Sequence, residues 1–521
     1  MRVMGKGILN GLAILMAAVQ AAACQDDAWA RYVPEFNSQD EELYANAVPN
    51  SAAEAFLRKN APSFLCPDKD IERTYHFRWW TYRKHIKKSS DGGRVVTEFL
   101  PPVPWAGPEN TINCAMGHHL REGRWLADAS ITWEYLKFML ENGRVYGPRA
   151  YSCWPAVSLV DWLDVTGDTQ RAFALKPLLE RNFAAWEKGW TMKPGRWFWW
   201  WPGFWYRIGK DDCGLFEITD NFEGSEMSLG GDGYRPLVNS AMYGEAMALS
   251  RLCRLAGEED KAVEYARKAA ELEAKIKNSL WNAEREFFTT MRTDSVQSPV
   301  RELHGYAPWY FGMPLDGYEK AWSSIMREDG FRAPFGLTFP ERSAKGFTIA
   351  YEGHECQWNG PSWPFATSIA LTALAKHLQS VGTKGTPDWT FAELLSQYAR
   401  QHRRRLETGT EIPWIDENVN PFTGDWISRT IILKNPEMMA RFAKERGKDY
   451  NHSTFCDLVI TGLVGFLPRA DGTFDVKPLA PREWEWFSLK NLRHCGHVVD
   501  IDYRRGRGLV VKVDGKTTQA R

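Results

Sequence analysis

Repeated pairs of helices joined by short glycine-containing turns are the feature that most restricts how this chain folds. One pair begins at Leu159 and turns at residues 166–168, and a second begins at Leu237 and turns at residues 256–258. In both turns a glycine ends one helix and an acidic residue begins the next, as helix caps prefer. We expect a third pair at residues 364–378 and 391–404, with Thr390 and Glu393 forming a capping box. The sequence therefore predicts an all-α fold from about residue 110 to 465.

Long, tryptophan-rich loops separate these hairpins, and this arrangement favours an (α/α)6 toroid over an irregular helical solenoid, which is the alternative. Residues 75–105 contain two β-prone stretches around the turn SSDGG, and further β-prone stretches follow Gly472. The predicted organisation is a signal peptide at 1–23, an N-terminal extension with minor β elements at 24–110, the (α/α)6 domain at 111–470 and a small C-terminal β tail, or appendage, at 471–521.

The first residues resemble an export signal. Arg2 and Lys6 are positively charged, residues 8–19 are apolar, and three alanines at 21–23 form a small-residue cleavage site. The apolar stretch is too short to span a membrane. Cys24 follows directly, so a lipid anchor at Cys24 and free secretion are both open. We expect an exported protein, either periplasmic or an outer-membrane-anchored lipoprotein.

The charge balance and the cysteine pattern exclude several classes of protein. Lys plus Arg and Asp plus Glu each number 65, so the formal net charge is zero, which argues against nucleic acid or an anionic membrane as a partner. The nine cysteines are scattered and none forms a CxxC pair, so we expect neither a metal site nor a redox motif. Buried free thiols are the preferred interpretation, and no cofactor is predicted.

The 25 tryptophans, by contrast, suggest a carbohydrate partner, because an aromatic face stacks on the flat C–H face of a sugar. The run at residues 186–206 is the densest, and it is either a flap that stacks on sugar or part of the core. Cleaving a glycosidic bond needs one carboxylic acid that protonates the leaving oxygen and a second carboxylate that acts on water or on the sugar carbon. Four loop segments offer suitable residues: FEITDNFEGSEMSLGGDGYRP at 216–236, WIDENVNPFTGDW at 414–426, WNGPSWP at 358–364 and GHHLREGRWLAD at 117–128.

In this order, the TDN loop, the WNGPSWP segment and the DENVNPFTG segment resemble the α/α-toroid glycosidases of family 63, whose relatives include mannosylglycerate hydrolases and trehalases. The resemblance covers roughly residues 115–465. It implies that Asp220 is the general acid and that Glu417 is the general base of a glycoside hydrolase that inverts the anomeric configuration. It also implies a subsite for the cleaved sugar, lined by Trp358, Asn359, Gly360 and Trp363.

Two departures from the family pattern bear on these assignments. TDNFEGSE stands where the family usually has DNS followed by an aromatic residue, which leaves Glu223 and Glu226 as alternative acids. Asn359 replaces an arginine of the family's WRGP motif, so the sugar specificity can differ. The remaining candidates for hydroxyl-binding groups in the cleft are Arg124, Trp125, Asp128, Arg235, Trp414 and His452.

Two other functions compete with a hydrolase acting on an α-linked oligosaccharide or polysaccharide. A polysaccharide lyase acting on a uronate-containing glycan would use a Tyr or His base and a neutralising Arg or Asn. Its candidates are His118, His119, Arg124, Tyr234, Arg235 and Asn239. A non-catalytic glycan-binding lipoprotein would need the tryptophans but not the carboxylates. Only the hydrolase gives Glu417 a role.

Overall fold

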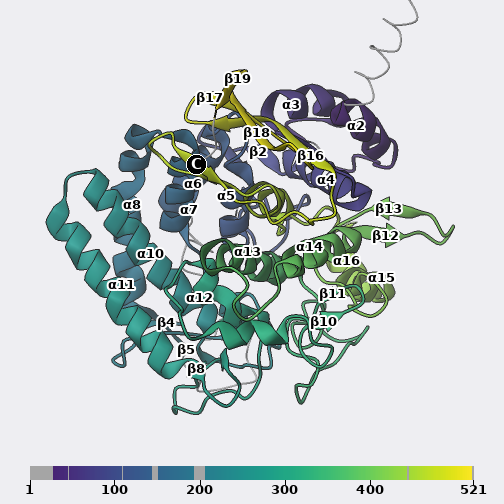
Figure 1. Ribbon diagram of the computed structural model, residues 1–521. Helices are drawn as coiled ribbons and strands as arrows, with labels where there is room; N and C mark the ends of the chain where they lie inside the picture. Colours follow the sequence, from purple (N-terminus) through teal and green to yellow (C-terminus); the bar gives the residue numbers. More distant parts are fainter. Residues whose placement is uncertain are drawn as a thin grey trace, which may run out of the picture.

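The computed structural model describes residues 27–44, 46–107, 109–142, 151–192, 206–442 and 445–518 (Figure 1). The predicted signal peptide, Cys24 and the tryptophans at 197–205 lie outside these residues. Among the described helices, none is long and apolar enough to cross a membrane. The helices are α2 (Ala28–Ser38), α3 (Ala53–Asn60), α4 (Lys69–Lys84), α5 (Met116–Gly123), α6 (Ser130–Asn142), α7 (Pro155–Thr166), α8 (Thr169–Lys188), α9 (Asp220–Glu223), α10 (Pro236–Leu255), α11 (Glu259–Ser279), α12 (Ala307–Tyr310), α13 (Pro364–Val381), α14 (Trp389–Gln401), α15 (Ile427–Lys434), α16 (Pro436–Arg441) and α17 (Phe455–Asp457).

The first two predicted hairpins are confirmed, and local chemistry accounts for their turns. Helix α7 begins with Pro155 and ends before Gly167, whose φ of 68° is readily adopted only by glycine. The Asp168 side chain then accepts a hydrogen bond from the amide of Arg171 at 2.9 Å and caps α8. Helices α10 and α11 are joined around Gly257, where φ is 75°, but the Glu258 side chain makes no capping hydrogen bond to α11.

The third pair, α13 and α14, also exists, but its predicted cap is wrong. Helix α14 begins at Trp389, one residue before the expected cap. Thr390 is therefore already helical, and its hydroxyl accepts a hydrogen bond from the hydroxyl of Thr386 at 3.0 Å. The pair also ends earlier than predicted, because residues 403–405 form a strand.

The helices form a closed ring. Contacts run from α4 to α14, α13, α12, α10, α7, α5 and α17, and from α17 back to α4. Helix α11 covers α10 on the outside, as the teal helices of Figure 1 show. A closed circuit of helices is the arrangement of a helical toroid. The predicted all-α toroid is therefore confirmed as a ring of helices.

Residues 75–84, predicted as β-prone, belong instead to α4. Thirteen of the sixteen residues of α4 are buried, including Arg78, Arg83 and Lys84. A helix that is buried on every side shows no apolar stripe, so the helical period is not visible in its sequence. The predicted turn that follows is present, between β2 (Ile86–Lys88) and β3 (Arg94–Val96).

The strands form small antiparallel sheets around the helical ring. One sheet has the order β4-β5-β6-β7, with β4 at Trp190–Met192, β5 at Tyr206–Lys210, β6 at Phe216–Ile218 and β7 at Gly233–Tyr234. Two-stranded sheets pair β8 (Trp281–Asn282) with β9 (Phe287–Phe288), β10 (Arg332–Ala333) with β11 (Gly336–Leu337), β12 (Arg403–Arg405) with β13 (Glu411–Pro413), and β14 (Phe466–Pro468) with β15 (Phe474–Val476).

The C-terminal strands pair with the N-terminal extension. The five-stranded sheet has the order β1-β16-β17-β18-β19, with β1 at Ser63–Leu65, β16 at Trp486–His494, β17 at His497–Arg504, β18 at Gly508–Val513 and β19 at Lys516–Thr518. In its register Ser63 faces Lys490. Figure 1 shows its C-terminal strands in yellow beside the purple helices α2 and α3. The predicted C-terminal β tail is therefore present, joined to a strand that comes from before the ring.

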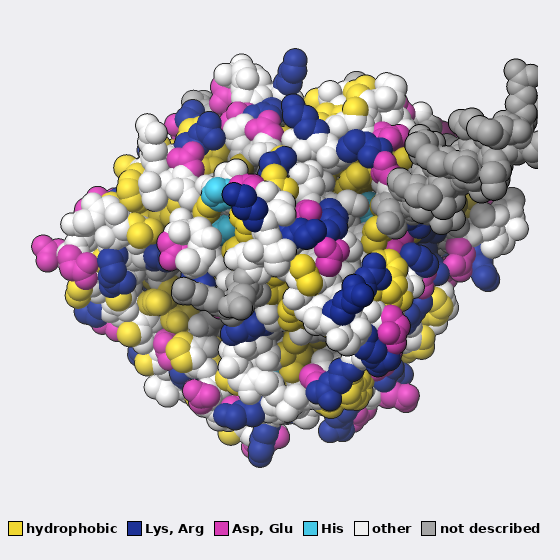
Figure 2. All heavy atoms as spheres, turned by 45° about the horizontal axis from the view of Figure 1, so that its top comes forward, with side chains coloured by type: hydrophobic (Ala, Val, Ile, Leu, Met, Phe, Trp, Pro, Cys, Tyr) yellow, Lys and Arg dark blue, Asp and Glu magenta, His cyan; other side chains and the backbone are white. Residues whose placement is uncertain are grey.

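Charged side chains are mixed over the visible surface. Figure 2 shows Lys and Arg interspersed with Asp and Glu, and neither sign forms a continuous field on that face. The eight cysteines among the described residues are free, but the expected burial holds for only four of them, Cys66, Cys153, Cys253 and Cys456, and Cys213 is exposed.

Candidate active site

Two of the four sequence segments contribute carboxylates to one cavity of about 500 Å³. Glu417 comes from the loop between β13 and α15, and Glu226 comes from the loop between α9 and β7. A cavity of this volume accommodates a small ligand. The remaining lining residues are Glu98, Phe99, Trp105, Ile112, Cys114, Tyr151, Gly224, Gly353, His354, Glu355, Cys356, Trp358, Trp363, Phe365, Met438, Arg441, Phe442, Arg446, Tyr450 and His452.

The loop around Glu417 is held by its asparagines. The Asn418 side chain accepts a hydrogen bond from the amide of Ser428 at 3.0 Å, and Asn420 caps a turn by accepting one from the amide of Phe422 at 2.9 Å. Val419 and Ser362 exchange backbone hydrogen bonds, both of 3.0 Å, which join this loop to the WNGPSWP segment. The ENVNPFTG motif therefore specifies a fixed loop shape that places Glu417 in the cavity wall.

Glu417 is 4% exposed, and its carboxylate has two partners. Arg446 donates to Oε1 at 2.7 Å, and the Ser428 hydroxyl donates to Oε2 at 2.5 Å. Burial raises the pKa of Glu417 to about 7, although Arg446 and Ser428 both favour the ionised form. A carboxyl with a pKa in this range can exchange a proton near neutral pH.

Glu226 is the carboxylate of the Asp220 loop that lines the cavity. The thiol of Cys356 donates a hydrogen bond to its Oε2 at 3.0 Å, and the Glu226 backbone carbonyl accepts one from the amide of Trp358 at 3.1 Å. Burial raises the pKa of Glu226. This carboxyl therefore favours the protonated form more than an exposed glutamate does.

Asp220 and Glu223, the other acidic candidates of this loop, have different surroundings. Asp220 starts α9 and does not line the cavity; burial and the nearby Asp232 raise its pKa. Glu223 is paired with the buried Arg235 at 2.5 Å. Burial alone would raise the pKa of Glu223, but the Arg235 charge holds it at about 2, so Glu223 is a poor proton donor.

Of the predicted subsite, Trp358, Trp363 and His452 line the cavity, and Asn359 and Gly360 do not. The two tryptophan rings are stacked, with centroids 4.0 Å apart. Gly360 instead allows a close backbone approach, because a Cβ there would lie 1.9 Å from the carbonyl oxygen of Thr348. Their assignment to a sugar site stays a prediction.

The structure places the other predicted binding residues in structural contacts outside the cavity lining. Arg124 pairs with Asp457 at 2.8 Å, and Trp125 donates to the same carboxylate at 2.8 Å. Asp128 pairs with Arg94 at 2.6 Å. Arg235 holds Glu223, as described above, and Trp414 is buried under the guanidinium groups of Arg404 and Arg429.

None of the lyase candidates lines the cavity either. His118 is buried and stacked on Phe365, with ring centroids 4.2 Å apart, and His119 contacts the carbonyl of Asn451 at 2.5 Å. The Asn239 amide is bonded to the backbone of Phe216. These side chains are therefore committed to the core.

Several cavity residues were missed in the sequence. Glu98, Glu355 and the pair Arg446 and Tyr450 come from three separate segments, and Arg446 pairs with both Glu355 at 3.1 Å and Glu417. The segment EFLPPVPW, at residues 98–105, carries the one usable signal, since an acidic residue beside aromatics and prolines is unusual for a solvated loop.

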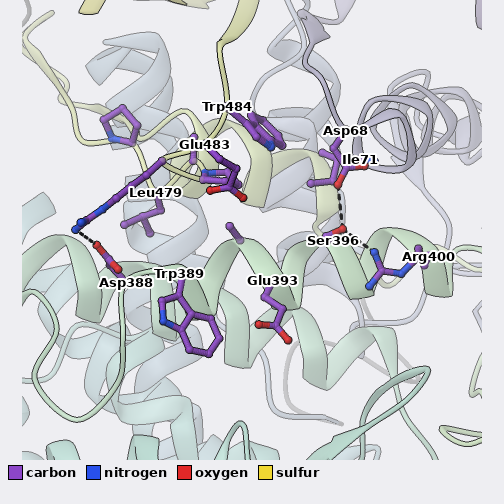
Figure 3. Close-up of a pocket in the computed structure, with 15 residues that line it drawn as sticks. Asp68, Ile71, Asp388, Trp389, Glu393, Ser396, Arg400, Leu479, Glu483 and Trp484 are labelled. Atoms are coloured by element: carbon purple, nitrogen blue, oxygen red, sulfur yellow. Dashed lines mark hydrogen bonds and ion pairs between the residues drawn. The ribbon is translucent and has the colours of Figure 1, made fainter. Parts of the chain in front are cut away.

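A second, larger cavity of about 850 Å³ lies between α14 and residues 478–484 and contains none of the predicted catalytic residues. Figure 3 shows Trp389 and Glu393 on α14 opposite Glu483 and Trp484. Ser396 connects Asp68 and Arg400 in its wall, with hydrogen bonds of 2.9 and 2.8 Å. Two of its four acidic residues, Asp388 and Glu393, are paired with Arg482 and Arg332. This groove therefore resembles a junction between parts of the fold more than a reaction site.

A ring of helices with buried carboxylates in one cavity is consistent with a glycoside hydrolase, and the comparison with known families assigns this class. The family model of the mannosylglycerate hydrolase MGH1-like glycoside hydrolase domain matches residues 108–453. The chain therefore belongs to the MGH1-like glycoside hydrolase family. Among curated proteins no sequence matches.

Solved structures support the same fold. A structure described as a sialidase is 34% identical with a TM-score of 0.82, covering 94% of this chain and 43% of its own. The GH78 rhamnosidase of Bacillus sp. GL1 is 14% identical with a TM-score of 0.54, and the match covers 85% of this chain and 40% of the rhamnosidase. The α-L-rhamnosidase of Streptomyces avermitilis is 11% identical with a TM-score of 0.53, and the match covers 88% of this chain and 38% of that enzyme. The chain thus spans less than half the length of each of these proteins.

Proposed function

We propose that this glycoside hydrolase inverts the anomeric configuration of a neutral, α-linked sugar, with Glu417 as the general base and Glu226 as the general acid. The observation that carries the proposal is that both buried carboxyls line the same cavity of about 500 Å³ and both have raised pKa values. In such a reaction one carboxyl protonates the leaving oxygen while the other activates a water on the opposite face of the sugar.

Glu417 suits the base. A water next to it gives a proton to the carboxylate while the water oxygen attacks the anomeric carbon. Because burial raises its pKa to about 7, the ionised Glu417 is a stronger base than an exposed glutamate. Arg446 and Ser428 fix both carboxylate oxygens, so the orientation of the base is set before substrate binds.

Glu226 is favoured over Asp220 as the acid because Glu226 lines the cavity and Asp220 does not. Burial raises its pKa, so Glu226 holds a proton to higher pH than an exposed glutamate does; on bond cleavage this proton passes to the glycosidic oxygen, which leaves as a hydroxyl. Asp220, which the family resemblance favours, lies six residues earlier in the same loop and outside the cavity lining. Single substitutions separate the two assignments.

A neutral sugar is favoured by the charges around the cavity. Four carboxyl groups line it, those of Glu98, Glu226, Glu355 and Glu417. The buried guanidinium of Arg446 is already paired with two of them. Arg446 is therefore not free to neutralise an anionic sugar, whereas the hydroxyl groups of a neutral sugar need no counter-charge. The stacked Trp358 and Trp363 and the ring of Tyr450 offer apolar surface for sugar C–H groups.

The finer architecture and the location belong to the same proposal. The closed helical circuit supports an (α/α)6 toroid that takes in α4 (Lys69–Lys84) of the predicted extension 24–110 as well as residues 111–470, and the appendage 471–521 follows it. The basic, apolar and small-residue pattern of residues 1–23 supports export, to the periplasm or to the outer membrane through a lipid on Cys24.

Proton NMR of the protein acting on a panel of α-linked disaccharides and plant or microbial glycans tests the function. We expect a reducing sugar that appears first as the anomer opposite to the substrate bond. A first product with retained configuration contradicts the inverting mechanism, and an unsaturated uronate identifies a lyase instead. No reaction across the panel counts against the proposed substrate class.

A further inference from the structure

Glu98 reaches the cavity from a segment that the family domain does not include. The family model begins at residue 108, yet Glu98, Phe99 and Trp105 line the cavity with Glu417. Glu98 is 2% exposed, and its backbone carbonyl accepts a hydrogen bond from the amide of Asn451 at 3.0 Å. One wall of the cavity therefore comes from the N-terminal extension.

This wall has a fixed shape because Asn110 holds it. The Asn110 side chain donates hydrogen bonds to the carbonyls of Phe99 and Pro101, at 3.0 and 2.9 Å, and accepts one from the amide of Val103 at 3.1 Å. Asn110 has a φ of 55°, a left-handed conformation that asparagine tolerates better than most residues. Residues 98–103 are thus held by Asn110, and Glu98 is presented at a defined position.

The wall also contacts the residues around the base. The guanidinium carbon of Arg446 lies 5.6 Å from the ring centroid of Phe99 and 5.5 Å from that of Trp105. The Phe99 and Tyr450 rings meet edge to face, with centroids 4.6 Å apart. Glu98 is therefore part of the same packed unit as Glu417 and its partner.

The carboxyl of Glu98 has an unusual environment. The Tyr450 hydroxyl donates a hydrogen bond to Oε1, and no Lys or Arg among the described residues pairs with it. Burial raises the pKa of Glu98 to about 8; the Tyr450 hydrogen bond opposes this shift, and the charges of Glu417 and Glu226 add to it. A buried carboxyl without a basic partner is costly unless other hydrogen bonds satisfy it.

Another buried glutamate shows the contrast. Glu245 on α10 is also 2% exposed, and its Oε1 accepts a hydrogen bond from the amide of Val157 at 2.9 Å. Glu245 does not line the cavity, so its role is confined to the core. Glu98 instead lines a space in which hydroxyl groups of a ligand can reach a carboxyl.

We propose that Glu98 is a sugar-binding residue whose carboxyl contacts hydroxyl groups of a neutral sugar in the cavity, and that Phe99, Trp105 and Ile112 form one wall of this subsite with it. The inference rests on the proposed function, because it takes the cavity to be the place where the sugar binds. Tyr450 fixes one oxygen of Glu98 and leaves the other for the substrate. Glu98 thereby determines which sugar is held, while Glu417 and Glu226 carry out the proton transfers.

Saturation-transfer difference NMR with D-glucose, D-mannose, D-galactose and L-rhamnose measures this directly, because it needs no turnover. Wild type and Glu245→Gln, the matched buried-carboxyl control, should bind one of these sugars alike. Glu98→Ala should bind it about tenfold more weakly, the loss expected for a buried hydrogen-bonding carboxyl. Glu98→Gln keeps hydrogen-bonding capacity and should fall between the two. On a cleavable glycoside, Glu98→Ala should raise KM about tenfold and lower kcat by less than that.

The outcomes separate this inference from the proposed function. Equal sugar binding by Glu98→Ala, Glu98→Gln and wild type overturns the role of Glu98 and leaves the hydrolase assignment standing. A kcat for Glu98→Ala as low as that of Glu417→Gln, with unchanged KM, also overturns it, because Glu98 then acts in proton transfer. If the wild type neither binds nor cleaves any sugar offered, the proposed function fails and this inference fails with it. Where Glu98→Ala does not fold, Glu98→Gln and Tyr450→Phe give the same comparison.

Discussion

The guanidinium of Arg446 lies 2.7 Å from Oε1 of Glu417 and also pairs with Glu355 at 3.1 Å. Arg446 is 3% exposed, so solvent weakens this attraction little. Burial pushes the pKa of Glu417 upward, and the Arg446 charge keeps the rise to about 7. The position of one arginine thereby sets the pH at which the proposed base becomes ionised.

The Ser428 hydroxyl, 2.5 Å from Oε2 of Glu417, makes this pH dependence testable. It stabilises the ionised carboxylate, so Ser428→Ala should raise the pKa of Glu417 further above 7. The base works only when it is deprotonated, and the acidic limb of kcat/KM should therefore move to higher pH, with a larger loss of rate at pH 6 than at pH 8. The pH–rate profile measures this, with Ser396→Ala outside the cavity as the control. An unmoved limb would mean that another group titrates.

Substitution of the carboxylates distinguishes the two candidate acids. Glu417→Gln and Glu226→Gln should each lower kcat by about 10²–10⁴-fold, the usual contribution of a general acid or base. Asp220→Asn should have a much smaller effect, because Asp220 does not line the cavity. Steady-state kinetics on an activated glycoside with a good leaving group add a second criterion. Such a leaving group needs little protonation, so it should partly restore the acid variant but not the base variant. If Asp220→Asn lowers kcat much more than Glu226→Gln does, the general acid is Asp220.

Arg124 should matter for stability and not for sugar binding. It pairs with the buried Asp457, which also accepts hydrogen bonds from Arg121 and Trp125. Arg124→Ala removes one partner of a buried ion pair and should lower the free energy of unfolding by about 3–5 kcal/mol. Denaturant unfolding checks this value. Arg327→Ala is the control, because its pair with Asp329 is exposed and should contribute little to the free energy of unfolding. A raised KM without lost stability would restore Arg124 to the binding site.

Glu245 predicts a dependence of stability on pH. Burial raises its pKa to about 8, whereas in the unfolded chain it titrates near 4.5. Between these values the folded protein binds more protons than the unfolded chain, so the free energy of unfolding falls as the pH rises from about 4.5 to 8. Glu245→Gln cannot ionise and should lose less stability over this interval. Melting temperatures from pH 5 to pH 8 measure the two slopes, and parallel slopes would contradict the assignment.

The parts of the fold that were predictable have local causes. Gly167 and Asp168 end and begin helices through their own backbone and side-chain chemistry, and the α7–α8 hairpin follows from them. The ENVNPFTG segment was informative for the same reason, since Asn418 and Asn420 bond to backbone groups within ten residues. Such signals need no knowledge of distant parts of the chain.

The parts that were missed depend on contacts between distant segments. Helix α4 has no apolar stripe because it is buried on all sides, and its charged residues find partners far along the chain, such as Lys84 with Asp449 at 2.6 Å. Glu98 meets Tyr450 across 352 positions, and nothing near either residue indicates the other. Glu226 lines the cavity and Asp220 does not, and the sequence of their loop alone does not determine which acid faces the cavity.

The pairing of β1 with β16 has a consequence for how the molecule is made. Ser63 faces Lys490 in that sheet, so the N-terminal extension meets its partner strand only after more than four hundred further residues have been synthesised. Long-range pairing of this kind slows folding, because a large loop must close before the contact forms. The helical hairpins can form early from neighbouring residues. The sheet that holds the N-terminal extension therefore cannot form until β16 has been made.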